Sequence, residues 1–237
     1  MSKILYLSDC YLKEWDAAVA KDNGKYIVLD QTAFYPNSGG QPCDTGTMKT
    51  ENGNEYKVVY VGKFSGDVSH EVDNGGLKAG DKVHCRIDWD RRYKLMRMHT
   101  AAHVFSRVIF DETGAVTSGN QLDLDKSRID FTLENLDKGK IKEWEKKANE
   151  IIAGGRNLKI SFYPREEAFK IPDFIRTSKL LVPEDLKTIR IVEIEGLDQQ
   201  ACGGTHLKNI SEIGKIEVLK VENKGKNNRR IYFRLIQ

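Results

Sequence analysis

The sequence predicts an α+β protein: a small N-terminal β-barrel over residues 1–88, followed by an α+β domain over residues 89–237. Two observations lead to this division. Up to about Trp89, short runs of β-branched and aromatic residues are separated by Gly, Asn and Asp clusters, a pattern typical of strands in a barrel or sandwich. From Asp90 onward, apolar residues recur at three- and four-residue steps, which is the period of a helix.

In the first part, strands are expected within residues 25–36, 55–64 and 81–89, because these runs alternate between apolar and polar side chains. Two stretches rich in glycine and asparagine, residues 36–46 and 72–81, are expected to be loops. The spacing of strands and loops indicates an all-β unit.

Two helices are expected in the second part. The first ends near Gly114, and the second covers residues 139–153 and stops at the pair Gly154-Gly155. Strands are expected at 127–134, 158–164 and 188–196, with a closing hairpin that turns around residues 223–228, so the sheet should be mainly antiparallel. The apolar faces of the two helices are Leu95, Met98, Ala102, Phe105 and Ile109, and then Ile141, Trp144, Ala148 and Ile151.

Composition excludes several classes of protein. No segment approaches the roughly 20 apolar residues that span a bilayer, and the apolar run near the N-terminus is too short for a signal peptide. The four cysteines are scattered without the spacing of a disulfide framework, so a cytoplasmic protein is expected. The net charge is only +3, so a nucleic-acid partner has to be argued from local clusters of basic residues.

Four residues in two motifs predict a metal site. His99 and His103 lie one turn apart on the first helix, and Cys202 and His206 repeat the four-residue step with two glycines between them. The glycines favour a tight loop rather than a helix interior. Imidazole and thiolate together suit zinc. Thr100 occupies the position where metalloprotease helices carry a glutamate, so that class of enzyme is disfavoured.

These motifs, HxxxH and CGGTH, together with FYPNSGGQPCDTG upstream, resemble the freestanding alanyl-tRNA editing proteins of the AlaX family, in their medium-length form. The resemblance covers nearly the whole chain and extends to the editing domain of alanyl-tRNA synthetase. It implies a zinc-dependent hydrolase that deacylates tRNA(Ala) mischarged with serine or glycine. It also implies that His99, His103, Cys202 and His206 bind zinc, and that Gly39, Gly40 and Gln41 form a substrate-binding motif.

Other functional assignments are less specific. Gly39-Gly40 is equally typical of a simple hairpin turn. Thr117 and Gln121, in what reads as a polar loop, are candidates to bind a serine hydroxyl, with Thr100 as the fallback. The basic residues of the last hairpin either contact tRNA or form an ordinary solvated surface. The candidate tRNA-binding residues are Lys224, Lys226, Arg229 and Arg230.

Three functions compete at this point. The favoured one is a zinc-dependent aminoacyl-tRNA deacylase. The second is a non-catalytic RNA-binding module with a structural zinc, because four protein ligands usually close a zinc site. The third, a metallohydrolase of small esters, has no acid–base pair in the sequence to support it.

Overall fold

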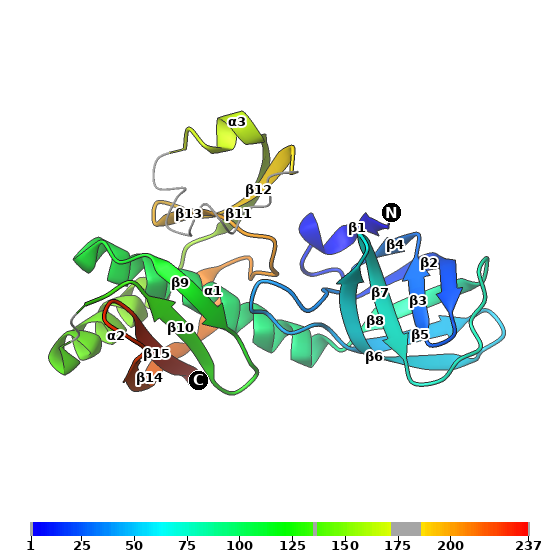
Figure 1. Cartoon of the computed structure of the whole chain (residues 1–237), viewed down its shortest axis with the longest axis horizontal. Coiled ribbons are helices and arrows are strands. Elements are labelled where there is room, and N and C mark those ends of the chain that lie inside the picture. Colours follow the sequence, from blue (N-terminus) through cyan, green and yellow to red (C-terminus); the bar gives the residue numbers. More distant parts are fainter. Residues whose placement is uncertain (1, 135–136, 172–185, 237) are drawn as a thin grey trace. The chain divides into compact units, whose positions relative to one another are not determined.

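The computed structural model describes residues 2–134, 137–171 and 186–236 (Figure 1). The chain forms two compact units, Met1–Leu95 and Met96–Gln237. The first is built from strands, and the second combines helices with antiparallel sheets. The expected α+β fold with an N-terminal barrel is therefore confirmed.

The first unit is a closed barrel of six antiparallel strands, joined in the order β2-β3-β7-β6-β5-β8. Their apolar side chains alternate inward along each strand and fill the barrel, with Ile27, Leu29, Met48, Val61 and Cys85 fully buried. Beside the barrel, two very short strands pair in parallel around a 3-10 turn, η1 (Leu5–Leu7). The strands are β1 (Lys3–Ile4), β2 (Glu14–Asn23), β3 (Tyr26–Leu29), β4 (Gln31–Thr32), β5 (Gly46–Thr50), β6 (Glu55–Phe64), β7 (Asp67–Val72) and β8 (Lys82–Ile87).

Two of the expected barrel strands match the structure closely, as β6 and β8, whereas the run at residues 25–36 is broken. The break occurs at Asp30, whose side chain accepts hydrogen bonds from the backbone N–H groups of Ala18 and Gln31. A carboxylate that bonds to nearby backbone competes with the strand ladder, which is why β3 ends before Asp30 and only the short β4 follows. The barrel also contains β2, β5 and β7, which the sequence patterns had not singled out.

Helix α1 (Trp89–Thr113) is the longest element of the chain. It begins after Asp88, whose carboxylate accepts a hydrogen bond from the Arg91 N–H, and ends at Gly114, which has a φ of +71°. The apolar face expected from the sequence, Leu95 to Ile109, is buried throughout. Among the described residues, no helix is long and apolar enough to cross a membrane.

In the second unit, a four-stranded antiparallel sheet has the order β14-β15-β10-β9. Helix α2 (Lys138–Ala153) covers the edge strand β14 of this sheet. The Asn149 side chain donates to the Ile216 carbonyl and accepts from the Ile216 N–H, so it satisfies backbone groups that an edge strand leaves unpaired. The buried face of α2 ends at Ile152, not at Ile151 as expected, because Ile151 is only half-buried. The strands are β9 (Thr117–Gln121), β10 (Ser127–Phe131), β14 (Lys215–Asn223) and β15 (Arg229–Ile236).

Residues 117–121, expected to be a polar loop, form strand β9 instead. Their turn-favouring side chains do not prevent pairing, because β10 supplies an antiparallel partner for all of them except Ser118. A second, three-stranded sheet has the order β11-β12-β13 and carries the short helix α3 (Arg165–Ala168). Its strands are β11 (Leu158–Pro164), β12 (Thr188–Ile194) and β13 (Asp198–Ala201), and the 3-10 turn η4 (Ile210–Ile213) follows.

Candidate metal centre

The second unit brings together the four residues of the two sequence motifs. The candidate ligand atoms of His99, His103, Cys202 and His206 all lie within 4.8 Å of one another. The Cys202 Sγ is 3.5 Å from Nε2 of His99 and 3.2 Å from Nε2 of His206. The three histidines are buried, and Cys202 is half-buried. Residues a hundred positions apart in the sequence thus converge on one point.

Local structure explains this convergence. His99 and His103 project from successive turns of α1, with their ring centroids 5.2 Å apart. Cys202 directly follows β13, and the chain then runs as a loop without regular structure to His206. The Gly204 N–H lies 3.4 Å from Cys202 Sγ and donates toward it. The loop therefore turns both the thiol and the second imidazole toward α1, as the adjacent glycines predicted.

Electrostatics favours the deprotonated forms of Cys202 and His206. Burial raises the pKa of the Cys202 thiol, but His99 and His206 outweigh burial and bring this pKa well below its usual value of 9.0. Burial, reinforced by the charge of His99, lowers the pKa of His206 well below 6.5. Thiolate and neutral imidazole are the forms in which cysteine and histidine bind a metal ion.

In two of the histidines, the ring nitrogen Nδ1 has a polar neighbour outside the cluster. Nδ1 of His206 lies 3.2 Å from the hydroxyl of Thr100, which also accepts a hydrogen bond from the Leu207 N–H. Nδ1 of His103 faces the buried carboxylate of Asp198 at 3.5 Å. In metal sites such neighbours fix which nitrogen carries the proton. The sequence reasoning missed Asp198, because an aspartate at the start of a strand carries no signal of this role.

The donor set fits a transition-metal ion. Tetrahedral zinc, with bonds of about 2.0–2.1 Å to nitrogen and 2.3 Å to sulfur, would hold ligand atoms roughly 3.3–3.6 Å apart. The two separations measured from Cys202 Sγ, 3.5 and 3.2 Å, are close to that range. Three imidazoles and one thiolate form a cluster suitable for a metal ion.

The glycine-rich motif lies in the first unit and forms a tight turn. Ser38 and Gln41 exchange two backbone hydrogen bonds, of 3.2 and 2.9 Å, across Gly39 and Gly40. The two glycines have φ values of +58° and +78°, as in the two-residue turns that favour glycine. The Gln41 side chain is buried. The hairpin-turn interpretation describes the backbone here, and a binding role would be additional to it.

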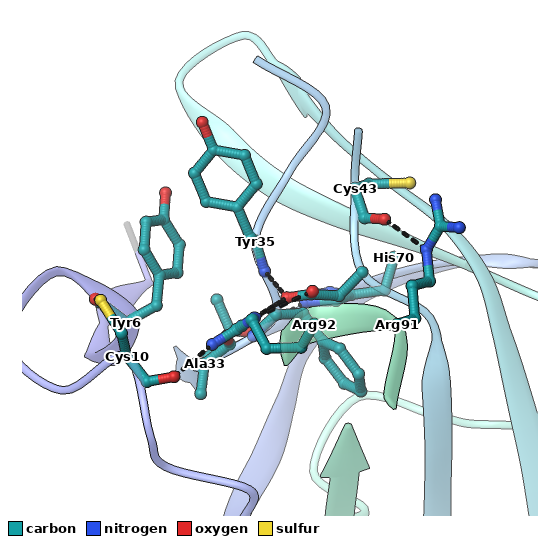
Figure 2. A network of polar contacts seen from close by, with 11 residues as sticks. Tyr6, Cys10, Ala33, Tyr35, Cys43, His70, Arg91 and Arg92 are labelled. Carbon is teal, nitrogen blue, oxygen red and sulfur yellow. Dashed lines mark hydrogen bonds and ion pairs between the residues drawn. The ribbon is translucent and has the colours of Figure 1, made fainter. Parts of the chain in front are cut away.

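A buried ionic network holds the base of this turn (Figure 2). Asp44 accepts a hydrogen bond of 2.6 Å from the Tyr35 N–H and pairs with the fully buried guanidinium of Arg92. Arg91 donates to the Cys43 carbonyl at 3.0 Å. The residues on both sides of the turn are thereby tied to the first turn of α1. The guanidinium of Arg92 also donates hydrogen bonds to the backbone carbonyl groups of Cys10 and Ala33.

The candidates for sensing a serine hydroxyl do not share one environment. Thr117 pairs with the buried Phe131, whereas Gln121 pairs with Arg128, and a register shift lies between these pairs. Their partners Phe131 and Arg128 are three residues apart on β10 and so point to opposite faces, and because of the register shift Thr117 and Gln121 do the same. The Thr117 hydroxyl donates to Ser106 of α1 at 3.3 Å. Gln121 is exposed, and its side chain contacts the Leu122 carbonyl.

The basic residues of the last hairpin are largely occupied within the protein. Lys224 forms an ion pair with Glu222 at 3.0 Å, and Arg230 pairs with Asp130 at 2.7 Å. Arg229 donates to backbone carbonyl groups of its own turn. Of the four candidates, Lys226 is the exposed side chain without an ion pair among the described residues.

Comparison with known proteins agrees with this site. Residues 2–91 match the family of class II (A) tRNA synthetases, and residues 189–232 match the second additional domain of threonyl- and alanyl-tRNA synthetases. The alanyl-tRNA editing protein AlaX-M of Methanosarcina mazei is 54% identical, over 100% of this chain and 97% of that protein. The AlaX-M protein of Saccharolobus solfataricus is 43% identical, over 98% of both chains.

The chain belongs to the AlaX-M family of alanyl-tRNA editing proteins. The alanine–tRNA ligase of Pyrococcus abyssi is also 40% identical over 98% of this chain, which corresponds to 26% of the ligase. This AlaX-M chain is thus similar to one segment of a much longer synthetase. The family expected from HxxxH, CGGTH and the glycine-rich motif is confirmed.

Proposed function

We propose that this protein hydrolyses the ester bond of mischarged tRNA(Ala), removes serine and glycine, and uses a zinc ion bound by His99, His103, Cys202 and His206. The observation that carries the proposal is the convergence of three imidazoles and a thiolate in a chain related over its full length to AlaX-M editing proteins. Because its substrate is a charged tRNA, we also propose that it acts in the cytoplasm.

An aminoacyl ester is already activated, so its hydrolysis requires little more than correct positioning of the ester and a water molecule. A bound zinc ion would supply a Lewis acid to polarise the ester carbonyl or to lower the pKa of a water molecule. The chain's own residues hold the ligands in the required form: the Gly204 N–H donates toward the thiolate of Cys202, and Thr100 contacts Nδ1 of His206. Because the Thr100 hydroxyl already has two protein partners, we assign it this structural contact rather than substrate recognition.

The glycine-rich turn is proposed to contact the substrate through its backbone. Only the N–H groups of Ser38 and Gln41 are used in the turn's own hydrogen bonds. Among the described residues, the N–H groups of Gly39 and Gly40 donate no hydrogen bond, so they can donate to an ester, ribose or phosphate oxygen. The side chain of Gln41, which is buried, would then stabilise the turn from the protein interior.

Selection against serine follows from a limit on binding. One methyl group is worth only about 1–3 kcal/mol, so a pocket built for alanine rejects glycine poorly, and it rejects an added hydroxyl weakly as well. An editing site must recognise what alanine lacks, which for serine is a hydrogen-bonding hydroxyl. Thr117 is our candidate partner, because it lies on the sheet face that contacts α1. Lys226 is our candidate for contact with the tRNA backbone.

A test of metal dependence combines metal analysis with deacylation. Purified Cys202→Ala and His103→Ala should lose most of their zinc and most of their activity on seryl-tRNA(Ala). His84→Ala is the matched control, because His84 is an exposed barrel histidine paired with Asp16. Full zinc content in both cluster variants would refute the proposed ligand set.

One observation favours a second function, a non-catalytic RNA-binding module. Four protein donors are characteristic of closed structural zinc sites, and this cluster offers four. Under that alternative, the wild-type protein would bind zinc and tRNA but would not accelerate ester hydrolysis. The same assay therefore separates the two functions.

A further inference from the structure

Asp198 is a buried carboxylate that lies beside the metal cluster and is not one of its four candidate ligands. Its side chain is completely shielded from solvent, although a carboxylate loses hydration energy when it is buried. Such a group is stable only where hydrogen bonds or opposite charges compensate for the lost water. The identity of its partners therefore indicates what Asp198 does.

One hydrogen bond and one close contact meet at the same carboxylate oxygen. The side-chain amide of Gln200 donates to Oδ2 of Asp198 at 2.7 Å, and Nδ1 of His103 lies 3.5 Å from the same oxygen. Since Nδ1 faces the carboxylate, Nε2 is the ring nitrogen of His103 that remains available to an ion. Asp198 thus lies on the Nδ1 side of a histidine of the metal cluster.

Strand pairing fixes this position. Asp198 opens β13 and pairs with Ile194 of β12. Cys202 directly follows the same strand. One short strand consequently carries both the thiol and the carboxylate behind His103, and a shift of its register would displace both groups together.

We propose that Asp198 is a positioning residue of the metal centre, which accepts a hydrogen bond from Nδ1–H of His103 and thereby presents Nε2 to the ion. The inference rests on the zinc site proposed above. A carboxylate behind an imidazole fixes the tautomer and makes the ring a stronger ligand. It would also add a negative charge beside a centre in which a bound zinc ion, one thiolate and three neutral imidazoles would sum to one positive charge.

Zinc affinity provides the test, measured on purified full-length protein by competition with a chromophoric chelator. Loss of such a carboxylate typically weakens metal binding by about 10- to 100-fold. We expect a loss of that size for Asp198→Ala. Asp198→Asn should lose less, because its amide oxygen can still accept from Nδ1–H. The matched control is Asp130→Asn, a buried aspartate that pairs with Arg230.

A spectroscopic measurement separates positioning from general stability. With Co²⁺ in place of zinc, the visible ligand-field spectrum should change in both Asp198 variants and remain that of the wild type in Asp130→Asn. If the Asp198 variants only unfold more easily, with unchanged affinity and spectrum in the folded fraction, the inference is overturned. If the wild-type protein itself binds no zinc, the proposed metal site is wrong and the inference falls with it.

Discussion

Acidification should destabilise the barrel through His70, which is completely buried. Its Nδ1–H donates to the Ile27 carbonyl at 2.9 Å, and its Nε2 lies 2.8 Å from the Thr32 hydroxyl. Burial is the main cause that lowers the pKa of His70, from 6.5 to about 4, although the bond to Ile27 opposes this shift. The ring therefore stays neutral in the folded protein at pH values where the unfolded chain is protonated.

The sign and size of the effect follow from this difference. Below about pH 6.5 His70 is protonated in the unfolded state, whereas in the folded state it is protonated only below about pH 4. The free energy of unfolding therefore falls as the pH is lowered from about 6.5 to about 4. At about 1.4 kcal/mol per pH unit, the loss between pH 7 and pH 5 is about 2 kcal/mol.

The assay compares the wild type with His70→Gln, in which a neutral amide can both donate to Ile27 and accept from Thr32. The free energy of unfolding is measured in urea at pH 7 and pH 5, with hydrogen exchange of the barrel amides as the local probe. The wild type should lose about 2 kcal/mol more than the variant, because every other titrating group is common to both. An identical pH dependence in the two proteins would contradict a lowered pKa of His70 in the folded state.

Three further perturbations test other parts of the structure. Arg92→Met leaves Asp44 buried without its counter-charge and should cost about 3–5 kcal/mol in urea unfolding, and a loss below about 1 kcal/mol would contradict the described network. Gly40→Ala should lower stability by about 1–2 kcal/mol, because its φ is +78°, whereas Gly40→Asn should cost less; equal stability of the two variants would argue against a left-handed turn. Asn149→Ala removes both partners of the Ile216 backbone, at about 1–3 kcal/mol for each group, and unchanged hydrogen exchange at Ile216 would contradict that contact.

The sequence was most informative where residue type alone limits the chemistry. Cys202 and His206 could be matched with His99 and His103 across a hundred positions, because thiolate and imidazole are the ligands that zinc favours. Helix faces were also predictable, since burial follows a fixed period. For the buried face of α2, the sequence pattern indicates Ile151, whereas the structure buries Ile152. Both residues fit the pattern, because the apolar face of a helix is wider than one row of side chains.

Features that depend on strand register could not be predicted in the same way. Asp198 has its place behind His103 only because β13 pairs with β12 in one alignment. Thr117 and Gln121 are separated onto opposite faces by a register shift that no composition signals. Asp130, the acidic partner of Arg230, lies on a neighbouring strand. The last hairpin therefore carries less unpaired positive charge than its sequence indicates. Local propensity also misjudged residues 117–121, because pairing with β10 overrides it.

The deacylation rate of seryl-tRNA(Ala) relative to alanyl-tRNA(Ala) shows whether this protein edits tRNA(Ala) at a metal centre. Both rates are measured with zinc-loaded wild-type protein and again after removal of the metal. We expect rapid loss of serine, little loss of alanine, and no acceleration without metal. Equal rates for serine and alanine, or full activity of the metal-free protein, would contradict it.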